Sequence, residues 1–251
     1  MTTILHFKYK FSMEHNSSPG PVGQAGQLLT ARASRRKFLR VAGYTGLAAS
    51  VLASCTKAIS NIKQDGKGPT NTVSLGSGDT GILNFAFALE QLEAAFYTAV
   101  VADPYENISS LELSRLTDIR DHEIAHREFL KTALGKDAIQ KLTPNFTSVD
   151  FSSRDSVLAT AKAFEDTGVS AYNGAGSLIT NPDYLTIAGK IVSVEARHAA
   201  YIRNLITPGS FADATVVNGN GLDTDRTPAQ ILPIVQPFIT EILDASGLPT
   251  S

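Results

Sequence analysis

The sequence predicts an all-α protein: a four-helix bundle with one long crossover and a short C-terminal helical extension. Four stretches carry apolar residues at steps of three and four, the pattern of a helix with one buried face. Each of these stretches also places a glutamate on its apolar face. The connection between the second and third stretches is long, whereas the other two connections are short. Together these features favour two helical hairpins joined across the length of a bundle.

Capping residues and helix breakers set the expected ends of the helices. The four helices are expected to cover residues 79–101, 109–134, 153–179 and 182–206. The expected N-caps are Asp79 or Thr80 for the first helix, Ser109 or Ser110 for the second, and Asn181 followed by Pro182 for the fourth. Gly135 is the expected C-cap of the second helix.

The crossover is expected to span residues 135–152. Extended chain of that length reaches about 59 Å at about 3.3 Å per residue. A helix of about 25 residues is only about 37 Å long. The crossover can therefore return the chain from one end of the bundle to the other.

Two of the helices carry a Glu-x-x-His motif on the apolar face. Glu123 and His126 form the first, and Glu195 and His198 repeat it 72 residues later. Residues three apart share one face of a helix, so each pair points the same way. A charge directed into a core requires a partner or a metal ion.

The other two helices each carry one glutamate on the apolar face. Glu90 and Glu165 are each followed by a tyrosine seven residues later, at Tyr97 and Tyr172. Glu93 is a rival to Glu90, but the matched spacing favours Glu90. The two tyrosines either pack in the core or donate hydrogen bonds to the carboxylates.

The stretches Leu83 to Tyr97 and Asp121 to His126 resemble the ferritin-like superfamily, and most closely its exported members related to desiccation-related proteins. The resemblance covers residues 79–206 and implies a bundle with a dinuclear metal site. It implies two divalent ions, iron or manganese, held by Glu90, Glu123, His126, Glu165, Glu195 and His198. Independently, two such ions would neutralise four buried carboxylates, and no Lys or Arg lies on the four apolar faces.

Several neighbouring residues leave alternatives open. His122, one turn before His126, either contacts a metal ligand or is partly exposed. Gly168, Gly174 and Gly176 weaken the third helix and serve either close packing or a channel to the metals.

The expected chemistry is metal-dependent oxidation or reduction of a small oxidant such as dioxygen or peroxide, by a ferroxidase-like or catalase-like route. The alternative is a metal-binding or stress-related envelope protein without catalytic activity, as the desiccation-related relatives suggest. Residues 56–251 contain 15 Lys and Arg against 23 Asp and Glu, a net charge of −8, which argues against a nucleic-acid partner.

The N-terminal residues 1–55 are expected to be a lipoprotein signal peptide. Ser34 to Arg40 matches a twin-arginine export signal, and the apolar run 41–54 is too short to span a membrane. It ends in a lipobox at Cys55, the sole cysteine of the chain. Residues 56–78 then read as a flexible tether, and 207–251 as a loop with a short helix. The expected location is the periplasm or cell envelope, with a lipid anchor in the membrane.

The lipobox generates a prediction about the mature N-terminus. Mass spectrometry of the protein isolated from membranes should find diacylglycerol on Cys55, because processing cleaves before that cysteine. A Cys55→Ser variant should instead stay unprocessed and lose the anchor. A mature terminus at another residue would contradict the prediction.

Overall fold

Four long helices form the body of the protein in a computed structural model that describes residues 71–250. The helices are α2 (Gly78–Ala102), α3 (Ser110–Leu134), α4 (Arg154–Gly176) and α5 (Pro182–Ile206). They confirm the predicted all-α bundle, and each starts within a residue or two of its expected position. The signal peptide, Cys55 and most of the expected tether lie outside the described residues.

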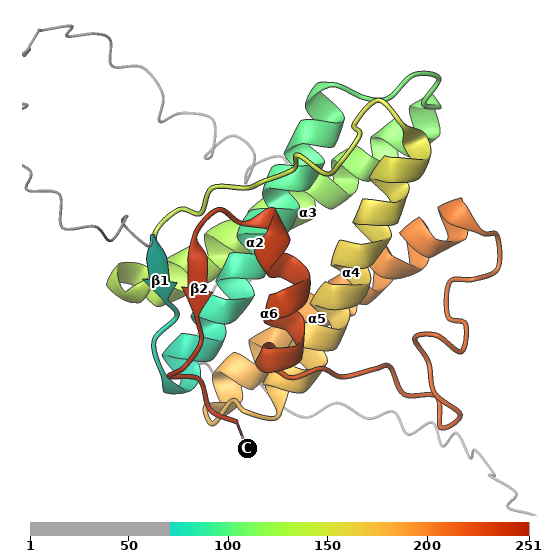
Figure 1. The fold of residues 1–251 in the computed structure, drawn as a ribbon. Coiled ribbons are helices and arrows are strands. Elements are labelled where there is room, and N and C mark those ends of the chain that lie inside the picture. The colour runs from blue at the N-terminus through green and yellow to red at the C-terminus, as the bar shows by residue number, and fades with distance from the viewer. Residues whose placement is uncertain (1–70, 251) are drawn as a thin grey trace, which may run out of the picture. The chain divides into compact units, whose positions relative to one another are not determined.

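The helices pack as two hairpins. α2 lies along α3, α4 lies along α5, and α2 also contacts α4. The connection between the hairpins begins with the short helix η1 (Gly135–Asp137) and then runs the length of the bundle to α4 (Figure 1). The predicted crossover therefore gives the bundle its topology.

Capping follows the sequence at most helix ends. The Ser109 hydroxyl accepts a hydrogen bond from the Glu112 N–H, and the Asn181 side chain accepts one from Asp183. Gly135 ends α3 with a positive φ of 57°. The third helix ends at Gly176 instead of continuing to residue 179.

The prediction that Asp79 or Thr80 caps the first helix is wrong. α2 begins at Gly78 after Ser77, and the side chain of Ser77 makes no capping hydrogen bond. The Asp79 carboxylate instead accepts hydrogen bonds from the backbone N–H groups of Thr180 and Asn181, both at 2.8 Å. These bonds join the start of α2 to the turn between α4 and α5 and lower the pKa of Asp79.

The segments flanking the bundle are more ordered than expected. Residues 72–74, assigned to the tether, form strand β1 (Thr72–Ser74), which pairs in parallel with β2 (Ile242–Asp244) near the C-terminus. The predicted short final helix is α6 (Pro228–Val235), followed by η2 (Gln236–Phe238). α6 packs on α4 (Figure 1), with Ile231 and Val235 buried against the bundle.

α2 is the central helix of the bundle. Among the described residues it is the one helix long and apolar enough to cross a membrane by length and composition. It is buried on almost every side, with Phe85, Phe96 and Tyr97 among the largest enclosed side chains. Its burial within the bundle accounts for its apolar composition.

Gly174 on α4 serves close packing, one of the two roles left open for the glycines. A Cβ atom there would lie 2.0 Å from the carbonyl oxygen of Arg226. The Arg226 N–H donates to the Ser170 carbonyl at 2.9 Å, which holds this C-terminal segment directly on α4. Only glycine permits such an approach of two backbones.

Replacing Gly174 with alanine should therefore destabilise the protein. The clash is with backbone, so the change should reach the upper part of the range of about 1–3 kcal/mol typical of overpacking. The melting temperature should fall by about 5 °C, as measured by calorimetry. Gly189→Ala is the control, because a Cβ there meets nothing within 4 Å and alanine favours a helix. Equal changes in the two variants would contradict this account.

Candidate metal centre

Six buried or half-buried side chains meet inside the bundle, and they are the six that the sequence singled out. They are Glu90 on α2, Glu123 and His126 on α3, Glu165 on α4, and Glu195 and His198 on α5. They form two groups, in each of which one ligand atom per residue lies within 4.8 Å of the others. The groups are Glu90, Glu123, His126 and Glu195, and Glu123, Glu165, Glu195 and His198. Glu123 and Glu195 belong to both groups and therefore lie between them.

Two tyrosines hold the glutamates that belong to one group only. The Tyr172 hydroxyl on α4 donates to Glu90 Oε1 at 2.6 Å, and the Tyr97 hydroxyl on α2 donates to Glu165 Oε1 at 2.5 Å. Each tyrosine thus donates its hydrogen bond to the glutamate on the other of these two helices. Burial, together with the charge of the contacted glutamate, raises both tyrosine pKa values well above 10. Both hydroxyls therefore keep their protons and act as donors.

The remaining polar atoms of the cluster make no hydrogen bond to any group outside it, and their close polar contacts are those between a histidine ring nitrogen and a carboxylate, although all four glutamates are 0% exposed. The unpartnered atoms are Oε2 of Glu90 and Glu165, both carboxylate oxygens of Glu123 and Glu195, and Nδ1 of His126 and His198. A buried polar atom without a partner costs about 1–3 kcal/mol, and more when it is charged. Eight such atoms facing one another are the donor set that a metal ion would satisfy, so these residues fit a metal site.

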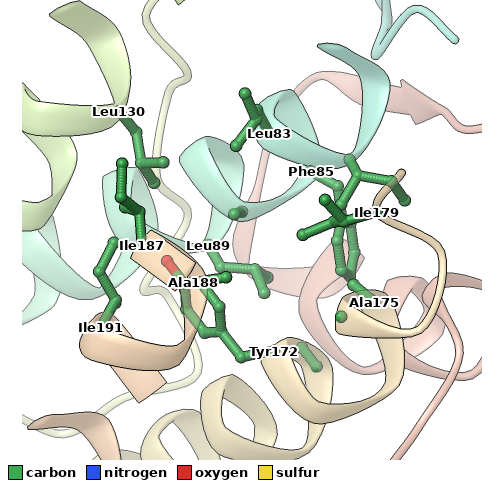
Figure 2. A pocket seen from close by; sticks show the side chains of 14 residues that line it. Leu83, Phe85, Leu89, Leu130, Tyr172, Ala175, Ile179, Ile187, Ala188 and Ile191 are labelled. Atoms are coloured by element: carbon green, nitrogen blue, oxygen red, sulfur yellow. The ribbon is translucent and has the colours of Figure 1, made fainter. Parts of the chain in front are cut away.

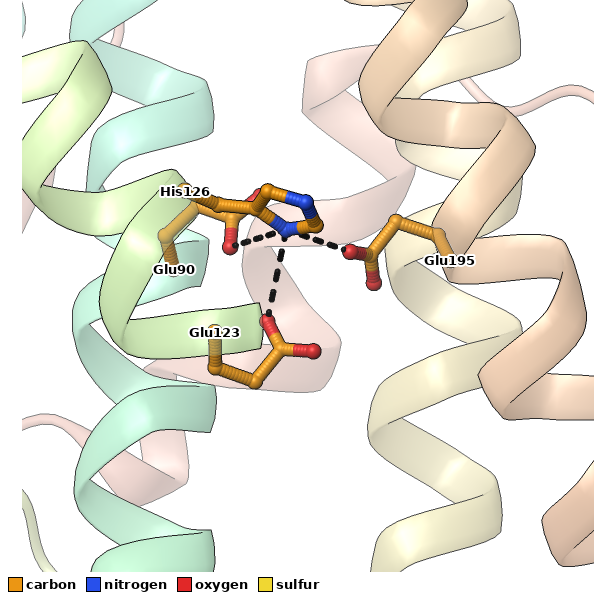
Figure 3. A group of neighbouring side chains, drawn as sticks. All are labelled: Glu90, Glu123, His126 and Glu195. Carbon is orange, nitrogen blue, oxygen red and sulfur yellow. Dashed lines mark ion pairs between the residues drawn. The ribbon is translucent and has the colours of Figure 1, made fainter. Parts of the chain in front are cut away.

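The two histidines approach the carboxylates through the same ring nitrogen. His126 Nδ1 lies 2.9 Å from Glu195 Oε1 and 3.5 Å from Glu90 Oε2 (Figure 3). His198 Nδ1 lies 2.8 Å from Glu123 Oε1 and 3.6 Å from Glu165 Oε2. Each histidine thus contacts the glutamate of the other Glu-x-x-His motif, across the α3–α5 interface.

The crowding of charge shifts the protonation of the cluster. Burial, then the charge of Glu90, raises the pKa of Glu195 to about 7, against the contrary effect of His126. Burial and the other glutamates also raise the pKa of Glu123 well above its usual value. Burial opposes the charged form of His126, but its contacts with Glu195 and Glu90 prevail and raise its pKa to about 10. Without metal, the cluster therefore retains protons at neutral pH.

His122 connects His198 to the surface. Its Nδ1 lies 2.9 Å from His198 Nε2, and the two rings stack at 5.1 Å with an angle of 8°. Burial and the charges of His198 and His126 lower the pKa of His122, which favours its neutral form. When neutral His122 accepts a hydrogen bond from the Nε2–H group of His198, the Nδ1 atom of His198 is the one that faces the carboxylates. His122 is thus exposed and also contacts a candidate ligand. Both properties that the sequence analysis treated as alternatives, exposure and contact with a metal ligand, therefore hold.

Glu93 is a fifth buried carboxylate beside the cluster. It is 3% exposed and lies outside both four-residue groups, whereas Glu90 belongs to the first of them. Burial, then the charges of Glu195, Glu165 and Glu90, raises its pKa well above the usual value. A Cβ on Gly168 would come within 3.1 Å of Glu93 Oε1 and 3.6 Å of Glu195 Oε2, so this glycine leaves room for both carboxylates. The spacing Glu90-x-x-Glu93 was the available signal that both glutamates face inward.

Comparison with known proteins agrees with this geometry. A family model for the ferritin-like domain matches residues 78–208, which contain all four long helices and all six clustered residues. A search of curated proteins gave no match. By its matched domain, its two-hairpin topology and its buried carboxylate and histidine cluster, this chain belongs to the ferritin-like family.

Proposed function

We propose that this chain binds a dinuclear iron or manganese centre and uses it for redox chemistry with dioxygen or peroxide. The observation that carries the proposal is the set of eight buried oxygen and nitrogen atoms that face one another and have no hydrogen bond to any group outside the cluster. Carboxylate and imidazole ligands together suit iron and manganese. The two overlapping groups support two ions, with Glu123 and Glu195 shared between them.

Charge balance supports the same stoichiometry. The four clustered glutamates carry four negative charges when ionised, which two divalent ions would neutralise. Glu93 adds a fifth carboxylate, and burial together with the charges of Glu195, Glu165 and Glu90 raises its pKa, which favours its uncharged form. In the cluster and its immediate contacts, no Lys or Arg side chain supplies the balancing charge.

The residues around the cluster would orient the ligands and exclude water. Iron or manganese bound there would supply one-electron redox changes and positions open to a small oxidant. Tyr97 and Tyr172 each occupy one oxygen of a glutamate and direct the other oxygen into the cluster. His122 orients the ring of His198 from the surface side. The enclosing helices keep the carboxylates dry, which strengthens their attraction for cations.

A second candidate function is to hold metal without turnover, as in a stress-related envelope protein. The complete burial of the four glutamates favours it, because enclosed ions exchange slowly. We place either activity in the periplasm or cell envelope, on the evidence of the twin-arginine pattern and the lipobox at Cys55. A redox assay of the metal-loaded protein with dioxygen and with peroxide separates the two functions.

The first prediction of this proposal concerns metal content. Glu123→Gln and Glu195→Gln preserve side-chain volume but remove the shared charges. Each should lower metal affinity by more than the roughly 10- to 100-fold typical of losing an outer-sphere partner. Elemental analysis of metal-loaded, dialysed protein measures the effect.

Two glutamate variants serve as controls. Glu128→Gln alters an exposed glutamate on α3 and should leave metal content unchanged. Glu93→Gln alters a buried carboxylate outside both groups and should also retain the metal. If Glu93→Gln lost as much metal as Glu123→Gln, Glu93 would be a ligand.

The second prediction concerns stability and pH in the metal-free protein. The pKa of Glu195 is raised from 4.5 to about 7, so its contribution to folding stability is fully present below pH 4.5 and is lost as the pH rises through 7. This loss is about 3 kcal/mol. His126 acts at higher pH, because its raised pKa removes stability between 6.5 and about 10. The metal-free protein should therefore melt at a lower temperature at pH 7 than at pH 5.

Metal should reverse this trend. Binding to the folded state adds about 4 kcal/mol at a thousandfold excess over Kd, or about 10 °C in melting temperature. The gain should be larger at pH 7 than at pH 5, because protons compete for the ligands. In metal-free Glu195→Gln the loss of stability between pH 5 and 7 should be smaller. A melting temperature that neither iron nor manganese alters would refute the proposed centre.

A further inference from the structure

An apolar cavity lies inside the bundle near the start of α2. Its volume is about 20 Å³, and its 14 lining residues come from α2, α3, α4 and α5 and from the turn after α4 (Figure 2). Tyr172 carries the single polar side-chain group of this lining, and its hydroxyl is already committed to Glu90. The cavity is therefore separate from the metal-binding cluster but in contact with it through Tyr172.

The lining approaches the cluster along three helices. Ala86, Leu130 and Ile191 all line the cavity. Each lies four residues from a member of the first four-residue group, Glu90, His126 and Glu195 respectively. Four residues are about one helical turn, or about 6 Å along the axis. The cavity therefore lies about one turn from the Glu90, His126 and Glu195 side of the cluster.

Size and polarity restrict what the cavity can hold. A cavity needs about 10–15 Å³ to admit a water-sized molecule, so about 20 Å³ accommodates one molecule of one or two heavy atoms. A buried water also needs two to four polar partners, whereas apolar cavities stay dry. Hydrogen peroxide has two hydroxyl groups that this lining leaves without partners. A small apolar molecule meets none of these penalties.

We infer that this cavity binds dioxygen and delivers it to the Glu90 and His126 side of the metal centre. The inference rests on the proposed redox function and selects dioxygen over peroxide as the oxidant taken up by this route. On the side away from the cluster the lining includes Gly176, Ile179 and Ile187, which are partly exposed. Rotation of the isoleucine side chains would admit a diatomic gas. The space beside Gly176 is not tightly packed, since a Cβ atom added there would make only an ordinary contact with Leu185.

Xenon provides a probe of the cavity that does not depend on metal or activity. Crystals of the metal-free chain under xenon pressure should show one xenon atom between Leu83, Tyr172 and Ile191, because xenon binds dry apolar cavities. Absence of xenon at this position, or an ordered water in its place, would overturn the inference.

Filling the cavity tests its role in delivery. Ala188→Leu adds three carbon atoms to the lining on α5. It should abolish xenon binding and slow oxidation of the ferrous-loaded protein by dioxygen about tenfold. Oxidation by hydrogen peroxide and the iron content should stay unchanged. Ala200→Leu is the matched control, since Ala200 lies on the same helix but lines a different groove.

The outcomes separate this inference from the proposed function. Loss of xenon binding with an unchanged dioxygen rate would make the cavity a packing defect and overturn the delivery role, as would equal slowing by both oxidants. If Ala188→Leu failed to fold, Ala175→Val would be compared by the same assays, because Ala175 lines the cavity from α4 and not from α5. If the wild-type chain bound no metal, the proposed function would fail, and xenon would still decide whether the cavity takes an apolar gas.

Discussion

Confinement of carboxylates in an interior without water is the constraint on which this structure depends. Glu90, Glu123, Glu165 and Glu195 are fully enclosed, and Glu93 lies beside them. Burial and mutual repulsion would destabilise such a cluster unless protons or cations neutralise it. The neighbouring residues stabilise the carboxylates or leave room for them. The hydroxyls of two tyrosines donate hydrogen bonds to two of the glutamates, two histidines face the cluster, and Gly168 leaves space for the carboxylates. The rest of the bundle forms the rigid wall that keeps these groups together.

The two hairpins contribute equivalent residues to the cluster, in an almost symmetrical arrangement. Tyr97 and Tyr172 exchange partners between α2 and α4, and the two Glu-x-x-His motifs exchange contacts between α3 and α5. A tyrosine seven residues beyond a glutamate lies about two turns away on the same face, too far to contact it. In the neighbouring helix of opposite direction, however, it lies level with that helix's glutamate. The crossover makes this reciprocal arrangement, because it sets α4 antiparallel to α2 (Figure 1).

The segments outside the hairpins stabilise the ends and one side of the bundle. Asp79 joins the start of α2 to the turn before α5, and β1 pairs with β2 from the other end of the sequence. α6 covers α4, and Arg226 approaches the backbone at Gly174. The cavity lies at the end of the bundle that Asp79 ties together. Rigid helix ends there would preserve a small void that looser packing would close.

The sequence by itself determined the four helices, their ends to within a few residues, the long crossover and the inward face that carries Glu90, Glu123, His126, Glu165, Glu195 and His198. These features follow from local rules, since helical periodicity and capping involve residues only a few positions apart. Tertiary structure alone decided that each tyrosine donates to the glutamate of the opposite helix, that His122 stacks on His198, and that residues 72–74 pair with 242–244. It also decided where the cavity lies. Such features depend on the relative height and rotation of helices far apart in the chain, which periodicity within one helix does not encode.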